Sequence, residues 1–338
     1  MKTSLRIALG VIILAAIIYF LKDIDFREVY SLLAEANNFY LFLAFVSLGI
    51  SVLIFNLRGI YSISPVAKTG FWFNLKATLA GHFVNIATPG AQIGGEPVRA
   101  YYLSKRYKKS ATDFFGAIIA DRLFHVITAL IFILISVLYI LTIIDLPSEL
   151  KVGLQTALIL ILFISLLALL LNSKKVRSKM IKIVEMMGWK EFKKNKKGKI
   201  GKIRNMVSKH SKKFFKMFLK VIKNKKIVAI GITLSLIHWL FVYLASYFLF
   251  LSFGMQINFL IVLAVYSVGS AIGEVSPTPG GVGLIEGSMI LMYSAFGIGF
   301  SAAFAVSVLS RMILYFYFLV LGGISIIILN KETSKLDN

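Results

Sequence analysis

The 338-residue chain contains no cysteine and only four histidines, and each shortage excludes a class of function. Without a thiol the chain cannot form a disulfide bridge or use a thiolate as nucleophile or metal ligand. The histidines, His82, His125, His210 and His238, show no metal-ligand spacing. A Walker-type phosphate-binding loop is also missing, so ATP hydrolysis by this chain is not indicated. We therefore expect no metal centre, no cofactor, no catalytic residue and no enzyme activity.

Apolar sequence is what the chain has in abundance. Hydrophobic residues make up 58% of it, and the mean hydropathy is +0.83. Long apolar runs of this kind predict α-helices that span a membrane. The composition predicts an all-α polytopic membrane protein with a single integral membrane domain over 1–338. We expect a multi-pass protein of the cell membrane.

Acidic residues are few and the basic residues are concentrated in one segment. The chain has 38 Lys and Arg against 15 Asp and Glu, and 21 of the 38 fall in 172–226 with only two acids. This excess predicts a cytoplasmic loop over 173–226. Apolar residues at helical spacing predict an interfacial helix that lies on anionic lipid through 193–226, with no nucleic-acid partner. The alternative is a solvated basic linker that only sets topology.

Six apolar segments are predicted to cross the membrane: 5–21, 40–57, 112–144, 152–172, 227–251 and 300–329. The basic residues before the first segment and after the last place both termini in the cytoplasm. Two further apolar segments, 77–98 and 257–296, are each predicted to begin and end on the same side. Such a segment cannot span, so we predict two re-entrant hairpins in addition to about six transmembrane helices.

A motif occurs twice, about 190 residues apart. Thr88-Pro89-Gly90 is followed by Gly94, Gly95 and Glu96 and then by Arg122, while Thr278-Pro279-Gly280 is followed by Gly281, Gly283 and Glu286 and then by Arg311. Proline and glycine break a helix, so these residues are the predicted hairpin tips. The repetition predicts an inverted-topology repeat, with repeat one over 40–144, a linking helix over 152–172 and repeat two over 227–330.

Ionisable residues near the motifs are the predicted site. An ionisable side chain at membrane depth costs at least about 2.5–3.5 kcal/mol, so several together need partners or a wet cavity. Arginine presents a rigid fork of donors that suits a phosphate. We expect Arg122 and Arg311, with Arg99 near the cytoplasmic mouth, to hold a lipid phosphate.

The acidic residues of the predicted site, Glu96, Glu274 and Glu286, would balance the arginines when the site is empty. They could also bind a cationic headgroup or a coupling proton. Asp121 is expected to orient its neighbour Arg122. The alternative is that the Glu96–Arg122 and Glu286–Arg311 pairs are internal ion pairs that fix each hairpin to the bundle.

The strings TPGAQIGGEPVRAYYLSK, ADRLF and PTPGGVGLIEG resemble signatures of the flippase-like membrane family that includes the transmembrane domain of lysylphosphatidylglycerol synthases. Relatives linked to archaeal lipid-linked sugar pathways are similar too. The resemblance covers about 5–330 and implies movement of a lipid between leaflets. Those synthases continue into a soluble aminoacyl-transfer domain, whereas this sequence stops at Asn338, so we expect no lysyl-lipid synthesis by this chain alone.

Two function classes follow from these observations. The favoured one is a lipid flippase or scramblase that moves an anionic phospholipid or lipid-linked headgroup through the paired hairpins. The alternative is a membrane enzyme or accessory subunit in lipid-linked glycosylation or lipid modification.

Overall fold

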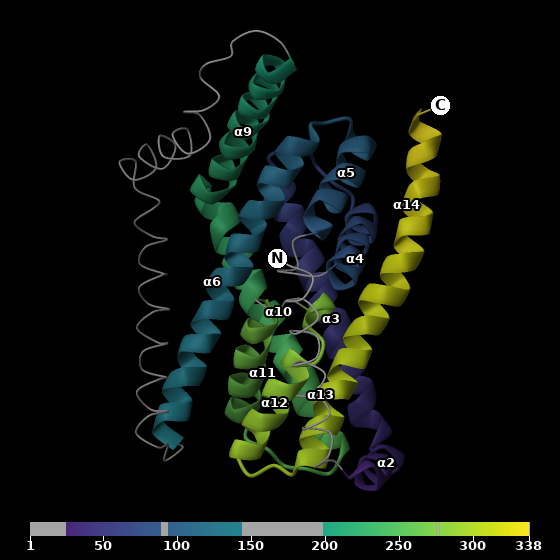
Figure 1. Ribbon diagram of the computed structural model, residues 1–338, viewed down its shortest axis with the longest axis vertical. Helices are drawn as coiled ribbons and strands as arrows, with labels where there is room; N and C mark the ends of the chain where they lie inside the picture. The colour runs from purple at the N-terminus through teal and green to yellow at the C-terminus, as the bar shows by residue number, and fades with distance from the viewer. Residues whose placement is uncertain (1–24, 89–93, 144–198, 275, 277, 338) are drawn as a thin grey trace.

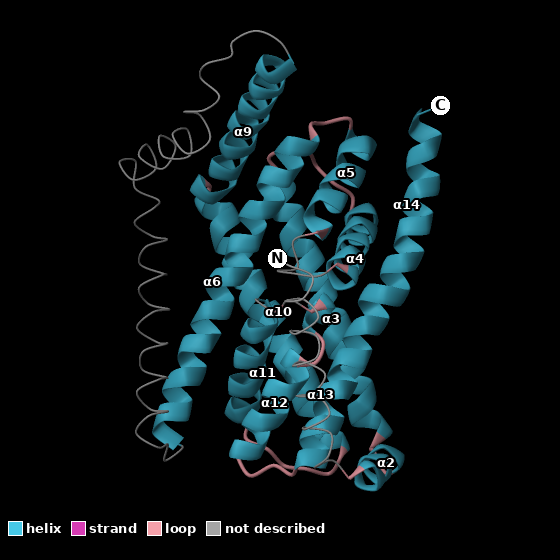
Figure 2. Ribbon diagram, viewed as in Figure 1, coloured by secondary structure: helices cyan, strands magenta, loops and turns pink. Residues whose placement is uncertain are grey.

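The computed structural model describes residues 25–88, 94–143, 199–274, 276 and 278–337, and every regular element in these ranges is a helix (Figure 2). Four helices are long and apolar enough to cross a membrane: Asn38–Ile63, Ala111–Thr142, Lys225–Ser252 and Phe300–Lys335. The expectation of an all-α polytopic membrane protein is confirmed. The predicted spans 5–21 and 152–172 lie outside the described residues.

The first half of the described chain contains a short helix, a long helix, two shorter helices and a second long helix. They are α2 (Phe26–Ala34), α3 (Asn38–Ile63), α4 (Phe71–Ala87), α5 (Gly95–Tyr107) and α6 (Ala111–Ile143). Helix α2 lies between the predicted spans 5–21 and 40–57. It begins where the Asp25 carboxylate accepts a hydrogen bond from the Arg27 N–H at 2.8 Å, which caps the helix.

The second half begins with α9 (Lys199–Lys223) and then repeats the order of the first. Its elements are α10 (Lys225–Ser252), α11 (Phe259–Glu274), the short 3₁₀ turn η2 (Pro279–Gly281), α12 (Leu284–Ala295), α13 (Phe300–Tyr315), the π turn η3 (Phe316–Val320) and α14 (Leu321–Asp337). A long helix, two short helices and a further long helix therefore occur twice along the chain.

The two sets run in opposite directions. Helices α4 and α5 lie at one end of the bundle, while α11 and α12 lie at the other (Figure 1). Helices α3 and α10 pack against each other in the centre and point in opposite directions (Figure 1). We call α4 with α5 the first hairpin and α11 with α12 the second hairpin.

The first hairpin depends on a close helix crossing. A Cβ added to Gly95 would lie 1.9 Å from the backbone oxygen of Gly81, so the two backbones touch at this point. The Asn85 side chain accepts a hydrogen bond from the Gly95 N–H at 2.6 Å and so satisfies one of the N–H groups at the start of α5. The crossing sets how closely the walls of the first hairpin approach each other.

The final long helix contacts both hairpins. Helix α13 packs on α12, and α14 packs on α4. The π turn η3 lies between them, and a Cβ added to Gly322 just after it would lie 2.7 Å from the Leu79 backbone oxygen.

Helix α9 packs against α6 through apolar side chains. Val221 is fully buried in the same core as Phe114 and Phe124, and the rings of Phe115 and Phe214 lie 5.6 Å apart. In Figure 1, α9 extends beyond the end of the bundle. Its predicted contact with anionic lipid stays a prediction.

Candidate functional site: a cavity beside the first hairpin

A cavity of about 70 Å³ lies where the first hairpin meets α3 and α6. The space is several times what one water molecule requires. Its polar wall combines three arginines with two acids, two histidines, a threonine and an asparagine: Arg58, Arg99, Arg122, Glu96, Asp121, His82, His125, Thr78 and Asn85. The first hairpin therefore faces a strongly polar, basic cavity inside an apolar bundle.

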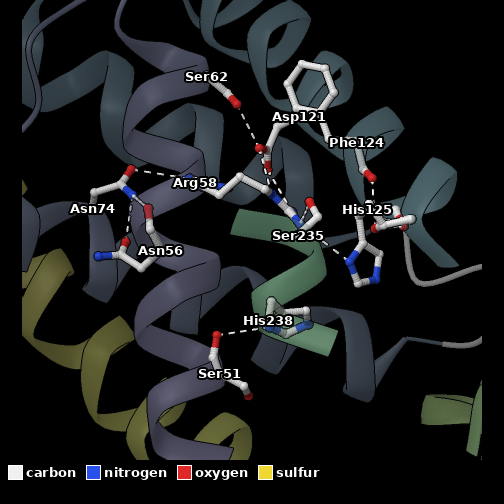
Figure 3. A network of polar contacts seen from close by, with 12 residues as sticks. Ser51, Asn56, Arg58, Ser62, Asn74, Asp121, Phe124, His125, Ser235 and His238 are labelled. Atoms are coloured by element: carbon white, nitrogen blue, oxygen red, sulfur yellow. Dashed lines mark hydrogen bonds and ion pairs between the residues drawn. The ribbon is translucent and has the colours of Figure 1, made fainter. Parts of the chain in front are cut away.

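Arg58 and Asp121 form the most buried ion pair described. Nε and Nη2 of Arg58 donate to the two carboxylate oxygens of Asp121 at 2.9 and 3.1 Å. Ser62 also donates to Asp121 at 2.8 Å, and Arg58 Nη1 donates to Ser235 at 2.9 Å (Figure 3). With Arg58 and Asp121 only 1% and 2% exposed, this network joins α3, α6 and α10.

This network corrects two predictions. The predicted span 40–57 ended before Arg58, but α3 continues to Ile63 and buries Arg58. Asp121 was expected to orient Arg122, but its carboxylate pairs with Arg58 instead. Neighbouring residues of a helix point about 100° apart, so Asp121 and Arg122 face different partners.

Glu96 and Arg122 form a second pair in the cavity wall. Arg122 Nη1 donates to Glu96 Oε1, which ties α6 to the start of α5. The other carboxylate oxygen, Glu96 Oε2, is buried and has no hydrogen-bond partner. The pairing predicted as the structural alternative is therefore present, and it leaves one acceptor atom of Glu96 unused.

Arg99 has no carboxylate partner among the described residues. Arg99 is only 5% exposed and lines the cavity, and its predicted place near the cytoplasmic mouth stays a prediction. Nη2 donates to Asn74 Oδ1 at 3.4 Å, a long hydrogen bond, while the buried Nε has no partner. The guanidinium packs on Gly59, where an added Cβ would lie 2.1 Å from Nη2. The fold thus makes room for a buried, incompletely paired cation.

Thr78 adds a third unpartnered atom to the cavity. It lies on α4, is 2% exposed, and its Oγ1 has no hydrogen-bond partner. Uncharged residues such as Thr78 and Asn74 were not predicted as site residues, because nothing in the hydropathy pattern distinguishes them from other small polar residues of apolar helices.

Three of the four histidines surround one aromatic ring. The rings of His82, His125 and His238 lie 4.9, 6.0 and 5.6 Å from that of Phe55. Arg58 stacks on the same ring at 4.4 Å, and His125 Nδ1 lies 3.4 Å from Arg58 Nη1. Sequence spacing did not indicate this cluster, because its three histidines lie on three different helices, α4, α6 and α10.

The second hairpin is closed by contacts with Arg311 of the neighbouring helix α13. Arg311 Nε donates to Glu286 Oε1 at 3.0 Å, and Arg311 Nη2 donates to the Gly280 carbonyl oxygen and to the Tyr315 hydroxyl. Glu286 Oε2 accepts from the Gly283 N–H at 2.7 Å. Arg311 does not line the cavity described above. The structure therefore does not bring Arg122 and Arg311 together in that cavity, although a shared phosphate was predicted.

The other predicted site residues lie at the hairpin tips or outside the residues that the structure describes. Thr88 ends α4, and Gly94 and Gly95 begin α5. Glycines are required in the second hairpin, where φ is 60°, 72° and 85° at Gly280, Gly281 and Gly283. Thr278 precedes η2, which begins at Pro279. Pro89, Gly90 and the Glu274 side chain lie outside the described residues.

Replacing Glu286 by glutamine is expected to loosen the second hairpin. The neutral amide weakens the hydrogen bond from Arg311 and cannot accept from both Arg311 and Gly283 through two carboxylate oxygens. Amide hydrogen exchange over 278–286 should therefore become faster. Glu332→Gln is the control, because it removes an ion pair with Lys76 elsewhere. Unchanged exchange over 278–286 in Glu286→Gln would contradict this role.

Comparison with known proteins gives a consistent result. Residues 7–323 match the family described as the lysylphosphatidylglycerol synthase TM region. A UPF0104 membrane protein of Methanothermobacter thermautotrophicus is 26% identical over 337 residues, covering 99% of this chain and 97% of the relative. UPF0104 membrane proteins of Pyrococcus horikoshii and Methanocaldococcus jannaschii are each 27% identical, covering 97% and 99% of this chain and 97% of each relative. The chain belongs to the family of the lysylphosphatidylglycerol synthase transmembrane region.

Proposed function

We propose that this protein moves an anionic lipid headgroup between membrane leaflets and that the cavity beside the first hairpin binds the headgroup. The observation that carries the proposal is Arg99, a buried arginine whose Nε has no partner and which has no matching carboxylate among the described residues. The lipid would leave chemically unchanged, so the proposed activity is transport and not catalysis.

A buried cation of this kind is costly unless something neutralises it. An incompletely paired ion buried inside a protein costs several kcal/mol even after the surroundings relax. A phosphate would remove this cost, because the guanidinium donates readily to phosphate oxygens. Membrane lipids are the phosphate-bearing molecules that surround a bundle of membrane-spanning helices. The chemistry of the cavity therefore favours a lipid phosphate.

The hairpins offer a way to release the headgroup on the other side. Glu96 forms an ion pair with Arg122 in this structure. A phosphate that enters the cavity can replace Glu96 as the partner of Arg122. The same helix order occurs in the opposite direction around the second hairpin. Inverted repeats of this kind expose a site alternately to the two sides in other transporters.

We further propose that the end of the bundle carrying α9 and the C-terminus faces the cytoplasm. The described residues of α9 present exposed lysines, among them Lys213, Lys216 and Lys220. Basic residues next to membrane helices favour the cytoplasmic side and attract anionic lipid. The opposite face of α9 packs on α6, so the lysines are the part available to the lipid surface.

Replacing Arg99 by glutamine is expected to slow lipid exchange by roughly tenfold or more, because a hydrogen bond to a charged group is worth about 1.5–3 kcal/mol. The purified full chain is reconstituted into liposomes with a fluorescent phosphatidylglycerol, and dithionite bleaches the probe in the outer leaflet. Continued bleaching of inner-leaflet probe reports exchange. The wild-type protein should exchange the lipid faster than empty vesicles do.

Arg106→Gln is the matched control, since Arg106 lies on the same helix, is exposed and does not line the cavity. Its exchange rate should equal that of the wild type. Wild-type vesicles that bleach like empty ones would overturn the transport proposal and favour an enzyme or accessory subunit. Equal exchange rates for Arg99→Gln and the wild type would show that the transported lipid does not bind in the cavity.

A further inference from the structure

Three titratable side chains inside the bundle take no part in the proposed function. His82 on α4 and His125 on α6 line the cavity, and the ring centre of His238 on α10 lies 5.5 Å from that of His125. All three, here called the histidine cluster, are half-buried and keep accessible surface. Among the described residues no three His, Asp or Glu side chains are placed to hold a metal ion. Histidine binds and releases a proton near neutral pH, so a proton is the ligand that fits the cluster.

The hydrogen-bond partners of two of these rings determine where their protons lie. Arg58 Nη1 lies 3.4 Å from His125 Nδ1, and because arginine can only donate, Nδ1 accepts and the hydrogen is on Nε2. His238 Nδ1 lies 3.0 Å from the Ser51 carbonyl oxygen (Figure 3). This oxygen can only accept, so Nδ1 of His238 donates and Nε2 is the nitrogen that can bind a proton. His125 is therefore neutral in this structure, and its neighbour His238 has a basic nitrogen to offer.

The charged residues that line the cavity beside the histidines come from α3, α5 and α6. They are Arg58, Arg99, Arg122, Glu96 and Asp121. Each of the two acids is paired with one arginine. Arg99 is the arginine left over, so a proton on the histidine cluster would add to a cavity that is already positive.

The other elements around the histidine cluster contribute aromatic rings. Phe318 of η3 stacks on His82 with the ring centres 4.2 Å apart, and Trp239 of α10 stacks on His125 at 4.7 Å. The charged residues of α4 and α10 do not line the cavity; they are Lys76, Lys225 and Lys226. The charges that line the cavity are therefore the ones that a proton on the cluster would meet.

An anion in the cavity changes this balance of charge. It cancels the excess positive charge, and where it replaces Glu96 as the partner of Arg122 it leaves a carboxylate without its cation. Both changes favour a positive charge on the histidines, because an opposite charge nearby stabilises the charged form of a titratable group. Coupling between two ligands is reciprocal, so a proton on the cluster favours the anion to the same degree.

We propose that His82, His125 and His238 form a proton-binding site that takes up a proton from the solvent together with the anion. This inference rests on the proposed function, because it takes the anion to be the headgroup of a transported lipid. A proton that enters and leaves with the headgroup couples the movement of the lipid to the proton gradient across the membrane. A proton on His125 Nδ1 would also break the contact with Arg58, because two donors would then face each other.

Proton uptake on lipid binding tests this inference. The purified full chain in detergent is kept near neutral pH with an indicator dye and almost no buffer, and phosphatidylglycerol is added. Its phosphodiester stays ionised throughout, so a proton that leaves the solution has bound to the protein. We expect uptake that rises with the amount of bound lipid and stops when binding saturates. We also expect binding to be about fivefold tighter or more in slightly acidic than in slightly alkaline solution, as couplings between two sites usually are.

The triple variant His82→Gln, His125→Gln and His238→Gln assigns the proton to the histidine cluster. Its amides can still accept from Arg58 and donate to the Ser51 carbonyl oxygen, but they do not titrate. Proton uptake should be lost, and the affinity for phosphatidylglycerol should no longer depend on pH. The wild-type measurement decides the inference even where the triple variant fails to fold.

Two further variants separate the cluster from other titratable groups. His210→Gln is the matched control, because His210 is exposed on α9 and does not line the cavity. It should take up as many protons per bound lipid as the wild type. Glu96→Gln removes the acid that an anion would separate from Arg122, and it should still take up protons when it binds lipid.

The outcomes distinguish this inference from the transport proposal. Lipid binding without proton uptake, and with equal affinity in acidic and alkaline solution, would overturn this inference and leave transport standing. Uptake that the triple variant keeps and Glu96→Gln loses would assign the proton to Glu96 and overturn the histidine assignment. Proton uptake on binding without any lipid exchange in liposomes would overturn the transport proposal alone.

Discussion

Replacing Asp121 by leucine is expected to destabilise the protein by about 3–5 kcal/mol, the usual result of removing one partner of a buried ion pair. Arg58 would keep its charge at 1% exposure and would lose the two hydrogen bonds of 2.9 and 3.1 Å that now neutralise it. The hydroxyl groups of Ser62 and Ser235 cannot replace a carboxylate. The unfolding temperature in detergent and the yield of monodisperse protein measure the effect.

The double variant Arg58→Met with Asp121→Leu is expected to recover most of this stability. Apolar residues of similar size in place of a whole buried pair are often neutral, or stabilising by about 1–4 kcal/mol. A double variant as unstable as Asp121→Leu would contradict the charge argument and indicate that the packing of the network matters more. Lipid exchange by a stable double variant would show that Arg58 supports the cavity wall without binding the headgroup.

The second large effect is expected at the crossing of the first hairpin. In Gly95→Ala the new Cβ would lie 1.9 Å from the Gly81 backbone oxygen, so α4 and α5 must move apart. Overpacking of this kind costs about 1–3 kcal/mol or more. Because both helices line the cavity, lipid exchange should be lost together with stability. Thermal unfolding and the dithionite assay measure the two effects.

Gly287→Ala is the matched control for Gly95→Ala. Gly287 lies inside α12, and a Cβ added there would meet no atom within 4 Å. Alanine in place of glycine inside a helix is expected to stabilise the protein by about 0.5–1 kcal/mol. If both variants unfolded at the wild-type temperature and exchanged lipid at the wild-type rate, the crossing would not be the constraint described.

Hydropathy and the repeated motif predicted the all-α fold and the long helices among the described residues. The apolar runs predicted α3, α6, α10 and the final long helix, and the Pro and Gly residues of the motif predicted where the hairpins break. Both Glu–Arg pairs named from the motif are present. These features depend on residues close in sequence or repeated at a fixed distance, which a single sequence shows directly.

The composition of the cavity could not be predicted in the same way. Arg58 follows an apolar run, as a residue at a membrane surface does, and only its partner 63 residues later shows that it is buried. The sequence analysis gave Arg122 and Arg311 the same role, but their surroundings in the structure differ. Arg311 of α13 donates to the Gly280 carbonyl oxygen at the tip of the second hairpin, whereas Arg122 of α6 lines the cavity beside the first hairpin. Ion pairs between different helices depend on the tertiary structure, and the hydrophobic periodicity of a single sequence does not predict them.

The π turn at Phe316–Val320 determines which side of the last helix meets the first hairpin. A π turn contains one residue more than an α turn, and each added residue rotates the following helix by about 100°. The residues after the turn therefore face a different direction from the one that an uninterrupted helix would give them. Gly322 contacts Leu79 in this rotated register. The single additional residue lets one continuous helix bond to the second hairpin with Arg311 and still present a glycine to the first.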